Sequence, residues 1–214
     1  MQLFDGCVIP YPSGTVSISR YARELRSLGF SGCVVNGRVP QTAEYDIQIL
    51  SARYLIDIPA RILAREADKP AGMNEVVYVR AGDAGFCRTA IQTPGVHVLM
   101  DIETAPKDAF DRYCAHLAAE KGVGIGLSTL PLIQLRDVSR QKVIRRYEEI
   151  FTLQNRYEFP LVVSSHASDI THLKSPREMI RLFSLVCEDE DLLYSSMTSV
   201  GQIKNRQGPV REVR

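Results

Sequence analysis

The chain has 214 residues, of which 45% are hydrophobic and 24% charged, and its formal net charge is +1. This composition can build a substantial core, so it argues against disorder, and the length suits one α/β barrel or doubly wound domain. No apolar run approaches the roughly 18 residues of a membrane span, and the first residues lack the positive charge of a signal peptide.

Five cysteines, Cys7, Cys33, Cys87, Cys114 and Cys187, are scattered along the chain without a Cys-x-x-Cys spacing. An odd number leaves at least one thiol unpaired in any disulfide scheme. The sequence therefore predicts buried, reduced thiols in a cytoplasmic protein.

Strand-like and helix-like segments alternate in the first half of the chain. Short apolar runs predict strands, while apolar residues three or four apart predict helices. The expected strands are 3–9, 33–35, 58–63, 76–79 and 96–100; the expected helices are one capped by Ser17 or Ser19 and stopped by Gly29, one over 43–55, and a short one within the loop 82–93, with 64–74 as a further loop.

The second half continues the alternation and ends in additional helices. We expect helices over 110–122, 139–154 and from Ser175, strands over 125–127 and 161–165, a helix after the acidic run 188–191, and a short last helix over 199–205. Parallel strands joined by helices form right-handed α/β arrangements. We interpret 1–207 as a single domain and 208–214 as a short basic tail.

The segment 159–178 carries the most specific pattern. Leu161, Val162 and Val163 predict a parallel strand that is buried on both faces, and Ser175-Pro-Arg-Glu178 is a capping box with proline at the first helical position. The polar loop 166–174 lies between them, at the carboxyl end of the strand, where α/β folds place functional groups.

This segment also resembles a known family. Ser-Ser-x-Ala-Ser, then Leu-x-Ser-Pro-Arg-Glu, preceded by a basic helix that ends in Arg-Tyr-x-Phe-Pro, is similar to the 30-kDa protein subunit (protein component 3) family of ribonuclease P. The similarity extends from about 96 to 206 and is weaker upstream.

The resemblance implies a modified TIM-type (β/α) barrel with extra C-terminal helices, related in shape to metal-dependent PHP phosphoesterases. It also implies a subunit of the ribonucleoprotein enzyme that removes the 5′ leader from precursor tRNA. In that enzyme the RNA carries the active site and its Mg²⁺ ions. This chain would bind no cofactor, contact RNase P RNA, protein component 2 and other RNase P proteins, and meet precursor tRNA indirectly.

A metal-dependent hydrolase is the main alternative. PHP enzymes hold metals with many histidines and carboxylates, whereas this chain has four histidines and none on its first strand. A single metal needs three ligands and water, which His97, Asp101, His166 and Asp169 could supply if they converge at strand ends. The competing interpretation places them as solvated or satisfied polar groups. A barrel that binds only proteins is a third alternative.

Other catalytic patterns are weaker. Ser165 and His166 are adjacent at a strand end, where neighbouring side chains point apart, and no Gly-x-Ser-x-Gly turn surrounds them. The glycines at 122, 124 and 126 precede a strand, whereas glycines that cradle phosphates follow one. Asp101 and Glu103 read as a solvated acidic turn. We therefore assign no catalytic and no metal-binding residue.

Basic residues are the best candidates for a functional surface. Between 134 and 146 the chain has five cations, Arg136, Arg140, Lys142, Arg145 and Arg146, against Asp137 alone, a local charge of +4. On a helical wheel Arg145 points away from the apolar face and Arg146 lies at its flank. The pattern predicts an RNA-binding helix; the alternative is a solvated helix with an Arg145–Glu149 pair.

Further candidate RNA-binding residues lie elsewhere: Arg88, Lys174, Arg177, Lys204 and Arg206. Arg61 and Arg80 also lie near predicted strand ends. Arg177 is a cation in the first turn of a helix, where the dipole disfavours it, which suggests an anionic partner.

Overall fold

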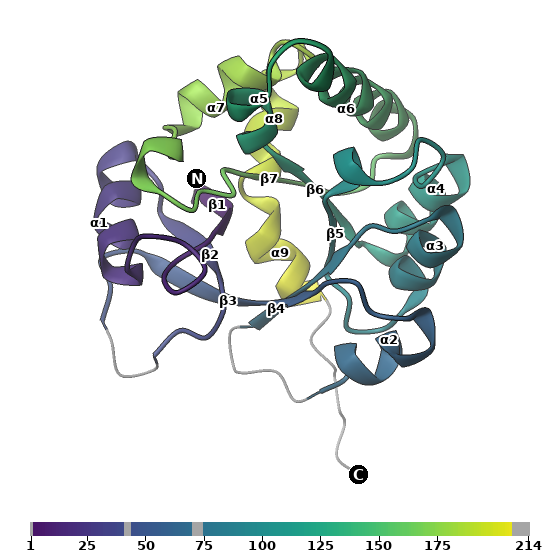
Figure 1. The fold of residues 1–214 in the computed structure, drawn as a ribbon, viewed down its shortest axis with the longest axis horizontal. Helices are drawn as coiled ribbons and strands as arrows, with labels where there is room; N and C mark the ends of the chain where they lie inside the picture. Colours follow the sequence, from purple (N-terminus) through teal and green to yellow (C-terminus); the bar gives the residue numbers. More distant parts are fainter. Residues whose placement is uncertain (1, 41–43, 70–74, 207–214) are drawn as a thin grey trace.

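The structure is a computed structural model that describes residues 2–40, 44–69 and 75–206, with the backbone only for 203–206. Within these ranges the chain forms a barrel of parallel strands surrounded by helices (Figure 1). The strands are β1 (Phe4–Val8), β2 (Gly32–Asn36), β3 (Gln48–Leu55), β4 (Glu75–Arg80), β5 (Val98–Met100), β6 (Gly124–Ser128) and β7 (Leu161–Ser164).

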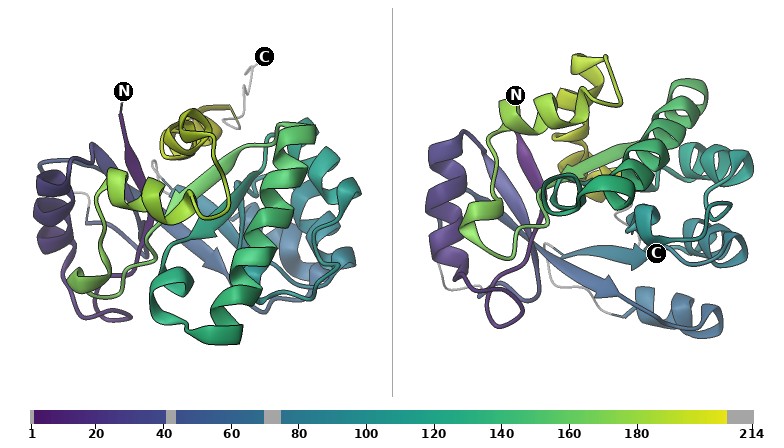
Figure 2. Two further views of the ribbon diagram at one scale, coloured as in Figure 1. Left: turned by 90° about the horizontal axis from the view of Figure 1, so that it is seen from above. Right: turned by 45° about the horizontal axis from the view of Figure 1, so that its top comes forward.

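Most of the helices cover the outside of the sheet, while the last one lies across one end of the barrel (Figures 1 and 2). They are α1 (Ile18–Leu28), α2 (Ala60–Ala67), α3 (Ala84–Gln92), α4 (Arg112–Lys121), α5 (Leu130–Gln134), α6 (Asp137–Tyr157), α7 (Pro176–Phe183), α8 (Glu190–Ser196) and α9 (Ser199–Arg206), with the short 3-10 turns η1 (Ile102–Thr104) and η2 (Ile170–His172). None of the described helices combines the length and apolar character that a bilayer crossing demands.

The strands pair in sequence order from β1 to β7, all in parallel. The sheet then curls back on itself: Val8 forms a parallel bridge to Ala167, and the His166 N–H donates to the Cys7 carbonyl at 2.9 Å. The result is a nearly closed barrel, which confirms the predicted TIM-type fold.

Side chains alternate between two apolar clusters, as parallel strands require. One cluster fills the barrel interior and includes Phe4, Val34, Tyr78 and Val162, while the other lies between the sheet and the helices. Gly126 makes room inside, because a Cβ there would stand 1.7 Å from the Met100 sulfur. Gly126 is therefore explained by packing, and a role in a phosphate-binding loop is not needed.

Helix α9 covers the end of the barrel at which the strands begin (Figure 2, left). The Phe4 N–H donates to the Met197 carbonyl at 2.8 Å, and Val200 is buried within the interior cluster. The acidic run 188–191 starts α8 as expected, with Asp189 as the N-cap and Glu190 and Asp191 in the first turn. The predicted additional C-terminal helices are thus confirmed, and the predicted tail 208–214 lies outside the described residues.

Two predicted elements are wrong. Segment 43–55 was expected to be a helix, but 48–55 forms strand β3, in which Leu50, Ala52 and Tyr54 alternate into the interior. Segment 58–63 was expected to be a strand, but α2 begins after Pro59 and buries Leu63 and Ala67 one turn apart. Both segments contain apolar residues compatible with either period, and the pairing of β3 with both β2 and β4 decides the first.

Smaller differences concern helix bounds. The 64–74 loop was expected to begin at Ala64, which belongs to α2, and 70–74 lies outside the described residues. Helix α4 begins after its cap Asp111 rather than at Phe110, and the short α5 was not expected. The capping box at Ser175 and Glu178 is confirmed, as are Ser17 and Gly29 at the ends of α1.

Candidate functional site

The end of the barrel at which the strands finish is filled by aromatic rings. Tyr54 on β3 and Tyr78 on β4 are paired in register and stack with their ring centroids 5.0 Å apart. The Tyr54 hydroxyl lies 2.8 Å from His166 Nε2, and the Tyr78 hydroxyl donates to the Gly6 carbonyl at 2.6 Å. These contacts occupy the place where barrel enzymes keep their catalytic groups.

Asp5 joins the first strand to the last at the same end. Its Oδ1 accepts from the Cys7 N–H at 3.1 Å and from the Ser165 N–H at 2.8 Å, while its buried Oδ2 has no hydrogen-bond partner. Burial raises the pKa of Asp5 to about 6, and donors from Ser165 and Cys7 offset part of that rise. The carboxyl group therefore links β1 to the residue that follows β7. We call this junction between the first and last strands the seam.

The proposed metal ligands do not converge. His97 precedes β5, at the end where strands begin, whereas His166 follows β7 at the opposite end. Asp169 caps η2 and accepts from the Thr171 N–H and the Thr15 hydroxyl, which holds its pKa low, at about 2. Within the described part of the chain no three His, Cys, Asp or Glu side chains gather into a potential metal site. The residues present thus do not fit a metal of the PHP type.

A serine nucleophile does not form either. The Ser165 hydroxyl donates to the Cys7 carbonyl at 3.3 Å and accepts from the Ala167 N–H at 3.1 Å, so it is committed to the seam. Burial lowers the pKa of His166. Its Nε2 atom lies 2.8 Å from the Tyr54 hydroxyl, while the Ser165 hydroxyl is bonded to the backbone, so the two side chains do not form a serine–histidine pair.

The acidic turn after β5 is less solvated than expected. Asp101 pairs with Arg80 at 3.7 Å, and Arg80 also approaches Asp57 at 3.6 Å. Burial raises the pKa of Glu103 to about 7, and one of its carboxylate oxygens is buried without a partner. The two carboxylates are thus in different environments, and the interpretation of both as solvated is wrong for Glu103.

Three exposed cations lie at the start and in the first three turns of helix α6. Arg136 stands at the N-cap, and Lys142 and Arg145 lie on the outward face. As far as the described residues go, none of these three forms an ion pair, and the Arg145–Glu149 pair of the alternative interpretation is absent. We call Arg136, Lys142 and Arg145 the α6 cations. Their charge is available to a partner.

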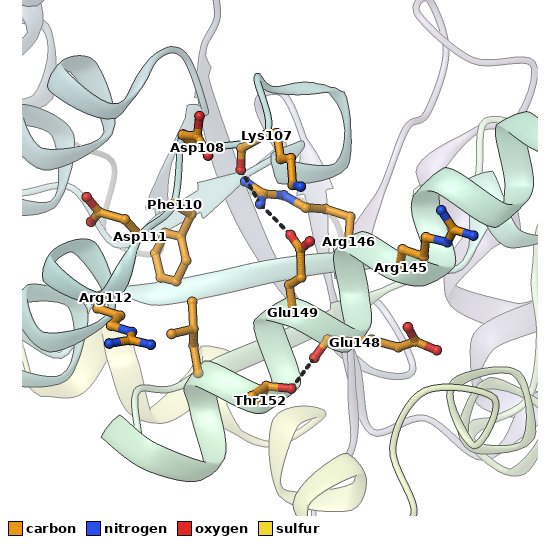
Figure 3. A pocket seen from close by; sticks show the side chains of 11 residues that line it. Lys107, Asp108, Phe110, Asp111, Arg112, Arg145, Arg146, Glu148, Glu149 and Thr152 are labelled. Atoms are coloured by element: carbon orange, nitrogen blue, oxygen red, sulfur yellow. Dashed lines mark hydrogen bonds and ion pairs between the residues drawn. The ribbon is translucent and has the colours of Figure 1, made fainter.

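Arg146 departs from its predicted place at the flank. Its side chain is 9% exposed, and it donates to the Lys107 carbonyl at 2.6 Å and to Glu149 at 3.0 Å (Figure 3). It therefore fastens α6 to the loop before α4 and is not presented to a partner. Arg140 is half-buried, and its Nε is buried without a partner.

A groove of about 720 Å³ runs between α6 and this loop, as Figure 3 shows. Arg145 and Arg146 point to different sides in this view. The groove is lined by Lys107, Asp108, Phe110, Asp111, Arg112, Arg145, Arg146, Glu148, Glu149, Thr152 and Leu153. Its four cations face four carboxylates, so the groove itself is not an anion site, and the excess positive charge lies nearer the start of α6.

Comparison with known proteins decides the family. The model of the family described as RNase P subunit p30 matches residues 2–203. The chain belongs to the RNase P subunit p30 family. It is 28% identical over 209 residues to Ribonuclease P protein component 3 of Haloarcula marismortui, covering 93% of this chain and 88% of that protein.

Solved structures agree with the barrel. A chain in the cryo-EM structure of archaeal ribonuclease P with mature tRNA superposes with a TM-score of 0.79 at 17% identity, covering 99% of this chain and 96% of that one. A zinc-containing histidinol phosphate phosphatase from Lactococcus lactis gives 0.56 at 7% identity, covering 94% of each chain. At these identities the likeness concerns the fold alone.

For this member of the p30 family, the remaining predicted RNA-binding residues lie in separate places. Arg88 on α3 pairs with Asp111 and lies over the Tyr113 ring at 5.3 Å from the centroid. The Lys174 amino group donates to the carbonyls of Thr171 and Leu173, and Arg177 is exposed on α7. The side chains of Lys204 and Arg206 lie outside the described residues. Their RNA-binding roles stay predictions.

One exposed aromatic residue was missed from the sequence. Tyr11, in the loop after β1, has 74% of its surface exposed. The available signal was Pro-Tyr-Pro immediately after the first strand, since a tyrosine fixed between prolines in a loop at this end of a barrel is placed to meet a partner.

Proposed function

We propose that this chain is a non-catalytic protein subunit of ribonuclease P that binds the RNA of the enzyme through the α6 cations. Membership of the p30 family supports the assignment to ribonuclease P, a ribonucleoprotein that processes tRNA. The single observation that carries the RNA-binding role is that Arg136, Lys142 and Arg145 are exposed together without ion pairs among the described residues.

The physical basis is phosphate binding by unpaired charge. RNA carries a phosphate at every nucleotide, and cations that neutralise phosphates release condensed counterions, which favours binding. Arginine is suited to this role because its planar guanidinium donates two parallel hydrogen bonds and remains charged at any cellular pH. A net charge of +1 then suffices, because the positive charge is local.

The non-catalytic role rests on the barrel mouth. Tyrosine rings fill the place of a barrel active site, and Ser165 and Asp5 are used to close the seam. Catalytic Mg²⁺ would accordingly be held with the RNA, and this chain would bind no cofactor of its own. Protein component 2, other RNase P proteins and, indirectly, precursor tRNA complete the proposed cytoplasmic assembly; the solved relative occurs in a complex with mature tRNA.

The test replaces Arg136, Lys142 and Arg145 with glutamine together. We expect weaker binding to RNase P RNA and a flatter dependence of log affinity on log salt, by roughly 0.7–0.9 for each phosphate that is no longer neutralised. The melting temperature should barely change, since substitutions at exposed positions without partners alter stability by only ~0.5 kcal/mol.

A matched control removes the same charge elsewhere. Arg23, Arg65 and Lys121 are exposed on α1, α2 and α4, and glutamine at all three should leave the salt slope unchanged. Equal losses from both triple variants would indicate non-specific attraction. An intact slope in the α6 variant would refute the α6 assignment. If the chain binds partner proteins but does not bind RNase P RNA, a scaffold that binds only proteins is favoured.

A further inference from the structure

Three loops at the strand-end rim of the barrel form one continuous surface. The Thr15 N–H donates to the Ser168 carbonyl at 2.9 Å, and the Thr15 hydroxyl donates to Asp169 at 2.8 Å, which ties the loop after β1 to the loop after β7. Gln134 Nε2 and His172 Nε2 lie 3.1 Å apart, which ties the loop after β7 to α5. We call residues 10–16, 168–174 and 134–138 the rim surface; its loops lie opposite α9 in Figure 2, left.

The rim surface exposes apolar groups. Tyr11 is 74% exposed, Val138 64% and Leu135 37%, and these are three of the six large apolar side chains that stand out from the described surface. Isolated exposed apolar residues need no explanation, but several on one hydrogen-bonded surface indicate a contact site.

Tyr11 is held in place by its loop. Its N–H donates to the Val16 carbonyl and the Gly14 N–H donates to the Pro10 carbonyl, both at 2.8 Å. Below the loop, the Tyr21 hydroxyl donates to the Ala167 carbonyl at 2.8 Å. The exposed ring is thus mounted on a fixed support, so a partner that stacks on it has little loop entropy to overcome.

The segments that form and flank the rim surface carry more cations than acidic residues. Residues 134–142 and 166–177 contain Arg136, Arg140, Lys142, Lys174 and Arg177 against Asp137 and Asp169, an excess of three cations. Asp169 is, in addition, already bonded to Thr15 and Thr171. An aromatic ring beside cations is the combination by which proteins bind unpaired nucleotides, with a base on the ring and phosphates on the cations.

We propose that the rim surface binds an unpaired segment of RNA, with one base stacked on Tyr11 and the flanking phosphates near Arg136. This inference rests on the proposed function and adds a second kind of contact to it. A base inside a helix presents no free face to a side chain, so the ring selects unpaired nucleotides. A protein partner is the competing occupant, and the excess of cations in segments 134–142 and 166–177 favours RNA over it.

The chain lacks tryptophan, which permits a direct test. A Tyr11→Trp variant carries one tryptophan, whose emission should be quenched as RNase P RNA is titrated to saturation, with saturation followed separately by gel shift. Tyr11→Ala should weaken RNA binding about 5- to 150-fold, the range of one base stacked on an aromatic ring, without changing the salt slope because the charge of the chain stays the same.

Two further variants separate stacking from apolar contact. Tyr11→Phe keeps the ring and should bind as the unchanged chain does, whereas Tyr11→Leu keeps an apolar side chain and should bind as weakly as Tyr11→Ala. Tyr113→Ala, which removes a half-exposed ring on α4 outside the rim surface, is the control and should leave RNA affinity unchanged.

The failures of the two proposals are distinguishable. Unquenched emission at saturation, or full affinity of Tyr11→Ala, overturns the stacking inference while a reduced slope in the α6 triple variant still supports the proposed function. If Tyr11→Ala weakens binding to a purified RNase P protein but not to the RNA, the rim surface is a protein interface and the inference is wrong. If neither the ring nor the α6 cations affect RNA binding, both proposals fall.

Discussion

Asp5 shows how one buried carboxyl group can set a pH dependence. Burial raises its pKa from 3.8 to about 6, so the folded chain holds this proton more tightly than the unfolded chain does. Stability should then fall as the pH rises from about 4 to 6 and level off above, because ionisation is disfavoured in the fold. A shift of this size corresponds to about 3 kcal/mol.

We expect Asp5→Asn to remove this dependence. The amide oxygen can still accept from Cys7 and Ser165, but nothing titrates, so the variant should gain stability over the unchanged chain between pH 4 and pH 7. Melting temperatures at four pH values in that range measure the difference, and the titration of Glu103 cancels because both chains share it. Asp108→Asn, at an exposed position, is the control. If the melting temperatures of Asp5→Asn and of the unchanged chain depend on pH in the same way, the prediction is contradicted.

The sequence could not reveal this role for Asp5. It marked an aspartate within a strand, but the partner that decides its environment, Ser165, stands 160 residues away. The same holds for the tyrosines of the barrel mouth, whose stacking depends on the register of β3 against β4. The sequence shows which residue types are present, but only the fold shows which of them come into contact.

On helix α6 the adjacent arginines should have opposite effects. Arg146→Gln removes the charged donor of the half-buried bonds to the Lys107 carbonyl and Glu149, so we expect a loss of ~1–3 kcal/mol in the free energy of unfolding and no change in RNA salt slope. Arg145→Gln should leave stability within ~0.5 kcal/mol and reduce the slope by ~0.7–0.9.

Urea unfolding and RNA titration at several salt concentrations measure both quantities, and each variant is the control for the other. A reduced slope in Arg146→Gln with unchanged stability would mean that this side chain leaves the Lys107 carbonyl and reaches the RNA.

Local signals predicted elements well where they were redundant. The α7 capping box and the ends of α1 were found because a cap, a proline or glycine, and an apolar period agreed at each place. Strand β3 was misassigned because Tyr45, Ile49, Ala52 and Ile56 fit a helical period by coincidence, and strand pairing overrode it. Helix α2 was misassigned because the apolar residues of 58–63 are also compatible with a strand. The α6 wheel correctly exposed Arg145, yet it could not anticipate the loop that packs over Arg146.

For the whole molecule we expect no cleavage of precursor tRNA by the purified chain. The barrel mouth offers tyrosine rings and a committed serine in place of a metal site, so added Mg²⁺ or Mn²⁺ should not produce turnover. Cleavage should appear only after RNase P RNA and the partner proteins are added. Cleavage by the pure protein would refute the non-catalytic role. Elemental analysis tests the separate expectation that the chain binds no transition metal, which about one zinc, iron or manganese per chain after dialysis would refute.

The barrel as a whole was predictable because the family resemblance and the strand and helix alternation pointed to the same fold. The resemblance was strongest from about 96 onward, and the two misassigned elements lie before that point. Upstream of 96 only the local pattern of apolar residues was available, and it could not separate a helical period from a strand period.

The seam between β1 and β7 has a consequence for how the chain is made. Val8 and Ala167 pair across the seam, so the first strand emerges from the ribosome long before its last neighbour exists. Until then β1 presents an open edge with unpaired backbone groups, and such edges recruit other chains. A nascent or truncated chain that ends before β7 should therefore aggregate or require a chaperone. This tendency should end once the β7 segment has left the ribosome and covers the edge of β1.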